Sequence, residues 1–131
     1  MSIGKSATPL GKVRGLGSAR EGGEHWIAER VISAALLLLG TWFLVSLLLL
    51  PDLGQRTIAE WLRSPAAAVP MALLIITAFR HGLDGMKGIV IDYIEGEGAR
   101  FALHTLLQFL AWGGGALALF ALGKIAFGAA Q

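Results

Sequence analysis

Three long apolar runs dominate the sequence and restrict it to folds that a lipid bilayer can surround. They cover about residues 29–50, 67–93 and 101–127, and short polar segments separate them. Each run is long enough to cross the hydrocarbon core as an α-helix, which needs roughly 20 residues. Because backbone polar groups inside a bilayer must be satisfied internally, helices are expected. The sequence therefore predicts an all-α integral membrane protein with three transmembrane helices.

Composition narrows the class of function. Of the 131 residues, 55% are hydrophobic and none is cysteine. The missing thiols exclude disulfides, cysteine-ligated iron–sulfur clusters and a cysteine nucleophile on this chain. The net charge of +2 resides mainly in tails and loops, and no basic patch with interleaved aromatic residues indicates a nucleic-acid partner. The polar segments are too short for a soluble catalytic domain, so we predict no catalytic residue, and any substrate chemistry must come from partner subunits.

The distribution of charged residues predicts the membrane topology and divides the chain into a tail and a membrane domain. Residues 1–24 read as a basic cytoplasmic tail and residues 25–131 as a membrane domain. Four basic residues precede the first span, whereas the two arginines of the next loop are offset by two acids. By the positive-inside rule the N-terminus is cytoplasmic. Residues 51–65, between the first two spans, are compatible with a short helix on the membrane surface, and the simplest interpretation of their role is a solvated connector.

Ionisable residues interrupt the second apolar run, where they are costly and usually face a bundle interior, a cavity or a cofactor. On an α-helix, one narrow sector carries an imidazole, two glycines and a carboxylate: His81, Gly85, Gly88 and Asp92. The glycines would let a flat group or another helix approach the backbone closely. The rise from His81 to Tyr93 is about 18 Å, which places His81 near mid-membrane if Tyr93 marks the interface.

These residues leave several uses open. A histidine within a span can bond a neighbouring helix, relay protons or ligate a haem iron. Of the charged residues beside it, Arg80 and Lys87 can neutralise haem propionates, or Asp84 can simply pair with either base along the helix.

Polar residues at the helix ends have a structural and a functional interpretation as well. Asp92 and Tyr93 are either interfacial residues or part of a site for a quinone, whose reduction needs hydrogen-bond donors and protons. His25 and Arg30, at the mouth of the first span, are interfacial anchors or line a polar site. The run Gly113-Gly114-Gly115 in the third span indicates close packing against another helix.

One spacing resembles a known family. His81, Gly85 and, eleven residues after the histidine, Asp92-Tyr93, together with three spans, a basic N-terminal tail and Arg30, are similar to the hydrophobic membrane anchor subunit of succinate dehydrogenase, respiratory Complex II. The resemblance covers roughly Glu24 to the C-terminus, and its specific part is the second span.

The resemblance implies a bundle completed by a companion cytochrome b subunit in a bacterial inner membrane, in preference to a mitochondrial one. It implies that His81 is one axial ligand of a haem b, the companion donating the second histidine. It also implies that Tyr93, Asp92 and Arg30 belong to a ubiquinone site beside the iron–sulfur subunit, which a flavoprotein subunit accompanies. The remaining candidate residues would contact the haem propionates or form a polar network: Arg80, Asp84, Lys87 and His25.

The sequence thus predicts a membrane subunit that docks a dehydrogenase and helps to pass electrons from succinate to quinone. The alternative is a small non-redox membrane protein that assembles helices or relays protons through His81, Asp84 and Lys87.

Overall fold

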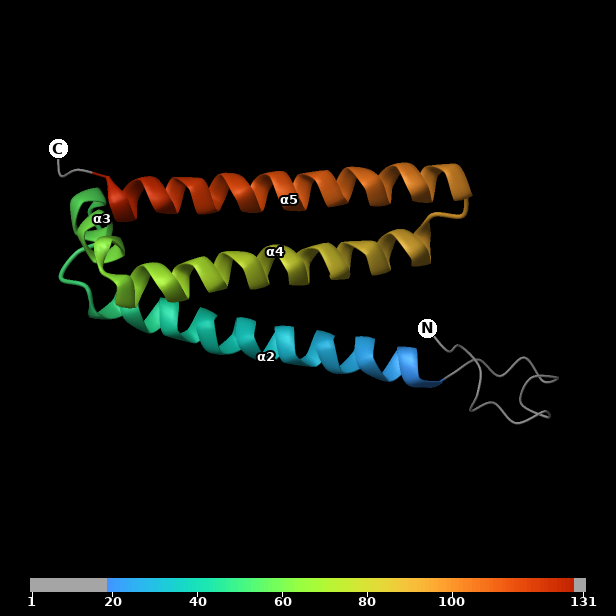
Figure 1. Cartoon of the computed structure of the whole chain (residues 1–131), viewed down its shortest axis with the longest axis horizontal. Helices are drawn as coiled ribbons and strands as arrows, with labels where there is room; N and C mark the ends of the chain where they lie inside the picture. Colours follow the sequence, from blue (N-terminus) through green and yellow to red (C-terminus); the bar gives the residue numbers. More distant parts are fainter. Residues whose placement is uncertain (1–18, 129–131) are drawn as a thin grey trace, which may run out of the picture. The chain divides into compact units, whose positions relative to one another are not determined.

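The computed structural model describes residues 19–128, with the backbone alone described at residues 19–22, 24 and 25. Helices make up almost all of this part of the chain: α2 (Ala19–Leu49), α3 (Gln55–Arg63), α4 (Pro65–Tyr93) and α5 (Glu97–Phe127) (Figure 1). Residues 19–128 contain no strand, which confirms the all-α prediction. Residues from Ile32 onward form one compact unit, and the residues before it form a second.

Three of the described helices are long and apolar enough to cross a membrane, as predicted. The candidate spans are Trp26–Leu49, Pro65–Tyr93 and Glu97–Phe127. The second and third helices begin two and four residues earlier than the predicted spans, which start at residues 67 and 101. Polar or capping residues can continue a helix past the hydrocarbon boundary, and Pro65 suits a first helical position because its missing N–H is not needed there. Hydropathy locates the membrane segment rather than the helix end.

The short helix predicted between the first two spans is present as α3. Its apolar side chains gather on one face, where Leu62 is buried, and it packs against both α4 and α5. The Trp61 ring stacks on Trp42 of α2 with centroids 5.7 Å apart. These contacts fix α3 across the end of the helical hairpin formed by α4 and α5.

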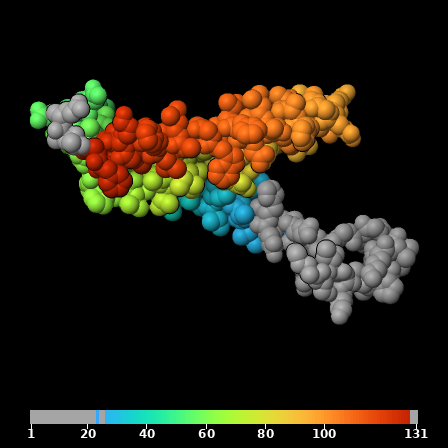
Figure 2. All heavy atoms as spheres, turned by 45° about the horizontal axis from the view of Figure 1, so that its top comes forward, coloured from blue at the N-terminus to red at the C-terminus, as the bar shows by residue number. Residues whose placement is uncertain are grey.

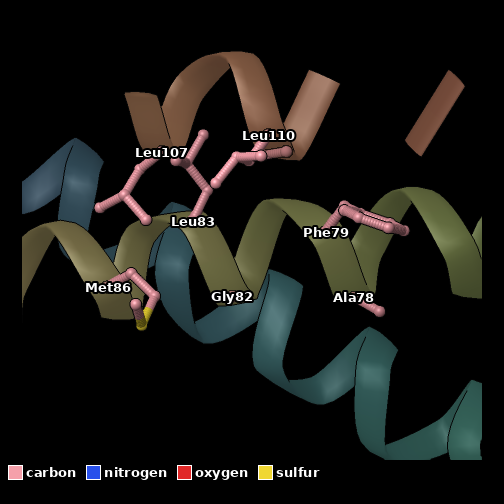
Figure 3. A pocket seen from close by; sticks show the side chains of 8 residues that line it. Ala78, Phe79, Gly82, Leu83, Met86, Leu107 and Leu110 are labelled. Atoms are coloured by element: carbon pink, nitrogen blue, oxygen red, sulfur yellow. The ribbon is translucent and has the colours of Figure 1, made fainter. Parts of the chain in front are cut away.

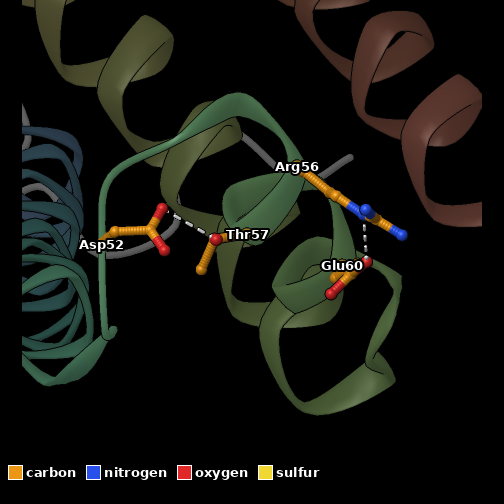
Figure 4. Close-up of polar contacts among 4 residues, drawn as sticks. All are labelled: Asp52, Arg56, Thr57 and Glu60. Carbon is orange, nitrogen blue, oxygen red and sulfur yellow. Dashed lines mark hydrogen bonds and ion pairs between the residues drawn. The ribbon is translucent and has the colours of Figure 1, made fainter.

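Asp52 organises the turn that leads into α3. Its Oδ1 accepts hydrogen bonds from the Gly54 backbone N–H at 2.7 Å and from the Thr57 hydroxyl at 2.8 Å. Figure 4 shows the second of these bonds beside the exposed Arg56–Glu60 ion pair of α3, 3.2 Å long. The backbone bond, and then the hydroxyl bond, lower the pKa of the Asp52 carboxyl from its ordinary value of 3.8.

Acid should therefore loosen the start of α3. Because the folded-state pKa is lowered, the stabilisation by Asp52 is present above pH 3.8 and is lost as the pH falls through the folded value. We expect lower hydrogen-exchange protection at the first amides of α3 when the pH drops from about 6 to about 3, after correction for intrinsic exchange rates. Asp52→Ala should lower protection at about pH 6, approach the wild type at about pH 3 and so remove this pH dependence; a variant that keeps it would contradict the assignment.

α4 and α5 form an antiparallel hairpin, connected at residues 94–96 (Figure 1). The two helices pack against each other, and the space-filling view shows α5 lying in front of α4 (Figure 2). The Phe79 ring lies against the glycine run: a Cβ on Gly114 would be 2.7 Å from its Cε1, and one on Gly115 would be 3.6 Å from its Cγ. The close packing predicted from the three glycines is therefore present at two of them.

Few of the described side chains are buried within this chain. The buried apolar residues are Leu62, Ala67, Leu83, Val90 and Leu122, whereas most large apolar side chains of α2, α4 and α5 are exposed. Such a surface would be unfavourable in water but is ordinary against lipid or against other helices.

Candidate functional site

The polar face of α4, defined here as His81, Gly85, Gly88 and Asp92, points away from α5. Phe79 and Leu83 of α4 pack toward α5, and the buried Val90 lies on the same side of α4. At 100° per residue these lie about 160–200° around the helix from His81. All four residues of the polar face are exposed. The hairpin therefore uses the apolar side of α4 and leaves the polar face without a partner among the described helices it packs against.

Glycines keep the backbone of this face open. A Cβ built on Gly85 or Gly88 would meet no described atom within 4 Å. The His81 side chain makes no hydrogen bond or ion pair within the described part of the chain. An exposed imidazole beside bare backbone can therefore receive a flat group or a neighbouring helix.

The charged residues next to His81 are not equivalent. Arg80 Nε lies 3.0 Å from Asp84 Oδ2, and the Asp84 side chain is only 15% exposed whereas that of Arg80 is 51% exposed. Of the two intrahelical pairs that spacing allowed, the structure has the one with Arg80. Lys87 forms no ion pair with any described residue. Of these two bases, Lys87 is therefore the one whose charge is available to an anionic group outside the described residues.

Asp92 and Tyr93 lie at the C-terminal end of α4. Tyr93 is the last helical residue and is 80% exposed, and Asp92 is exposed beside it. The following Ile94 donates its backbone N–H to the Val90 carbonyl oxygen at 3.1 Å. The phenol therefore stands at the helix end with no described side chain covering it.

The two candidates of the first span lie in α2. The Arg30 guanidinium stacks over the Trp26 ring, with Cζ 4.5 Å from the ring centroid. This cation–π contact is typical of an aromatic and basic pair at a membrane boundary. The side chain of His25 lies outside the described set.

An apolar groove runs along one side of the α4–α5 hairpin. Its volume is about 360 Å³. Apart from one glycine, it is lined by apolar side chains (Figure 3): Ala78, Phe79, Gly82, Leu83, Met86, Leu107, Leu110 and Ala111. It offers no ionisable group, so the chemistry of the site belongs to the polar face of α4.

Two polar residues that the sequence did not single out have unusual surroundings. Nε2 of His104, in α5, is buried and has no hydrogen-bond partner in residues 19–128. Arg100 reaches from the first turn of α5 to backbone carbonyls at the end of α4. A basic residue shortly after a Glu-Gly-Glu-Gly turn could have suggested the second contact, whereas no pattern in the sequence indicates the first.

The helices and the polar face define a class of protein: a three-span membrane protein in which the polar face of α4 points away from its own hairpin. A model of the transmembrane subunits of succinate dehydrogenase and fumarate reductase matches residues 4–122. The chain therefore belongs to the succinate dehydrogenase/fumarate reductase transmembrane subunit family, as its sequence pattern predicted.

Individual relatives agree with the family. The chain is 31% identical over 122 residues to the succinate dehydrogenase hydrophobic membrane anchor subunit of Paracoccus denitrificans, covering 93% of this chain and 94% of that one. It is 30% identical over 108 residues to the subunit of the same name from Rickettsia bellii, covering 76% of this chain and 86% of the relative.

Proposed function

We propose that this chain anchors a succinate dehydrogenase in a bacterial inner membrane and contributes to haem b binding and ubiquinone reduction. The observation that carries the proposal is the polar face of α4, which ends beside Tyr93 and has no partner in its own hairpin. A companion cytochrome b subunit would cover this face. In this arrangement residues 25–131 form the anchor domain, and residues 1–24 form a basic tail on the cytoplasmic side.

The residues around His81 fit a haem shared between two chains. This chain would offer His81 as one axial ligand, and the companion cytochrome b subunit would give the second. Gly85 and Gly88 leave space for a flat ring. Lys87 is free of ion pairs among the described residues and can neutralise a propionate, while Arg80 can do so alongside its bond to Asp84. When bound, haem b stores and passes single electrons.

The end of α4 fits a quinone head group. The Tyr93 hydroxyl can donate a hydrogen bond to a quinone oxygen, and Asp92 can hold or pass a proton with nearby water. Arg30 is the additional cation proposed for this site. With the N-terminus cytoplasmic, α4 ends at the cytoplasmic face, where an iron–sulfur subunit would deliver electrons from the flavoprotein. Catalysis thus belongs to the assembled complex.

The alternative role, a polar network for helix assembly or proton relay, finds less support. Such a network would join His81, Asp84 and Lys87. Within residues 19–128 Asp84 pairs with Arg80, and neither His81 nor Lys87 has a polar contact. The dehydrogenase anchor is therefore the function that the geometry favours.

Tyr93→Phe tests the proposal in a complex purified through a tag on this chain. Flavoprotein and iron–sulfur subunits should co-purify with the wild type. Because the variant keeps the ring but loses the hydroxyl, quinone reduction should fall about tenfold or more. Succinate oxidation by a soluble dye should stay unchanged, since the dye takes electrons before the membrane site.

Two results would contradict the proposal. One is a wild-type chain that purifies without dehydrogenase subunits. The other is a Tyr93→Phe complex with normal quinone reduction, which would leave the tyrosine as an interfacial anchor. Equal loss of dye and quinone activities would instead identify an assembly defect in the variant, and Tyr93→Trp, which keeps an interfacial ring with a donor, would then be compared with it.

A further inference from the structure

We propose that Arg100 is a positioning residue that holds Asp92 and Tyr93 in place for quinone reduction. The inference rests on the proposed function of these two residues. It concerns a side chain of α5 that does not itself belong to the polar face of α4.

The contacts of Arg100 join the two helices of the hairpin. Its Nη2 donates to the Ile91 carbonyl oxygen at 3.2 Å, and its Nε donates to the Ile94 carbonyl oxygen. Its own backbone N–H donates to the Gly96 carbonyl oxygen at 2.9 Å. One partly buried residue thus ties together the end of α4, the turn and the first turn of α5.

The end of α4 needs such a contact. The last four carbonyl groups of a helix have no partner within it, and a cation there is favourable because of the helix dipole. The last turn of α4 contains no basic residue and does contain Asp92. Glu95 and Glu97 follow, so the local sequence adds negative charge where positive charge is favourable. Arg100 supplies the missing cation and two donors from across the turn.

This contact determines the position of the phenol. Tyr93 is 80% exposed, so packing within this chain does not fix its ring, and the backbone path through residues 92 and 93 must do so. Arg100 binds the carbonyls of Ile91 and Ile94, the residues immediately before and after that pair. Without the guanidinium the last turn can fray, because the turn that follows contains Gly96.

Steady-state kinetics of the whole complex tests the inference. For Arg100→Gln we expect the KM for a short-chain ubiquinone analogue to rise about threefold to tenfold, with kcat changed much less, because fewer molecules hold Tyr93 in the binding position. Arg100→Lys keeps the charge but not the planar fork and should recover part of the loss. Dye-linked succinate oxidation should stay at the wild-type level in both. Arg56→Gln removes the same charge from an exposed pair in α3 and should change neither constant.

The outcomes separate the inference from the function on which it rests. An unchanged quinone KM in Arg100→Gln, while Tyr93→Phe is impaired, overturns the positioning role alone. A normal Tyr93→Phe complex overturns the quinone site and the positioning role together. If Arg100→Gln does not assemble, hydrogen exchange at residues 92–95 is compared between the wild type and Arg100→Lys; equal protection in the two overturns the inference, and faster exchange in the lysine variant supports it.

Discussion

Replacing His81 with alanine is expected to remove the haem absorption from the purified complex. His81 is an exposed imidazole without a polar partner among the described residues, and it lies beside backbone that Gly85 and Gly88 leave open. If the iron takes one axial nitrogen from each chain, loss of this nitrogen breaks one of the two bonds that hold the group. The measurement is a reduced-minus-oxidised spectrum, normalised to flavoprotein content in the same sample.

Two further variants separate ligation from general damage. Gly85→Leu keeps the histidine but fills the open face, and because a Cβ there meets no described atom within 4 Å, the hairpin should be unaffected while haem content falls. His104→Leu removes the other imidazole of the described spans, whose Nε2 is buried without a partner, so its replacement should cost little stability and leave the spectrum intact. An unchanged spectrum in His81→Ala would reject His81 as the ligand.

Hydropathy predicted the helices well because a bilayer leaves the backbone few choices. The three spans and the connecting helix α3 all appear, and the glycine run marks a real helix contact. The starts of the helices were predicted less well. α4 and α5 begin outside the apolar segments, at Pro65 and Glu97. Outside the hydrocarbon core, backbone hydrogen bonding determines where a helix starts, and hydropathy does not report it.

Side-chain partners were harder to predict than helices. Spacing allowed Asp84 to pair with Arg80 or with Lys87, and only the packed structure distinguishes them. The polar sector of α4 followed from helical periodicity, but its direction did not, because several faces of α4 carry apolar residues. That direction depends on which of them packs on α5, and Phe79 and Leu83 do. The bonds of Arg100 join residues six and nine positions apart across a turn, beyond the reach of any helical spacing rule.

Gly114→Leu should weaken the packing of α4 on α5, whereas Gly113→Leu should not. A Cβ on Gly114 would lie 2.7 Å from Cε1 and 3.1 Å from Cζ of Phe79, but one on Gly113 would meet nothing within 4 Å. Overpacking of this kind typically costs about 1–3 kcal/mol. Both substitutions raise helix propensity equally, so their difference isolates the contact. The measurement is the temperature at which this subunit dissociates from the purified complex.

Phe79→Ala tests whether the Phe79 ring causes this effect, because it removes the ring with which the side chain introduced by Gly114→Leu would clash. Alone it should destabilise the hairpin by leaving a cavity, and combined with Gly114→Leu it should recover part of the loss, a non-additivity that a double-mutant cycle measures. Equal effects of Gly113→Leu and Gly114→Leu would contradict the packing. Since Phe79 lies two residues before His81 and nearly opposite to it on α4, the same contact that joins the hairpin also turns the polar face outward toward a partner.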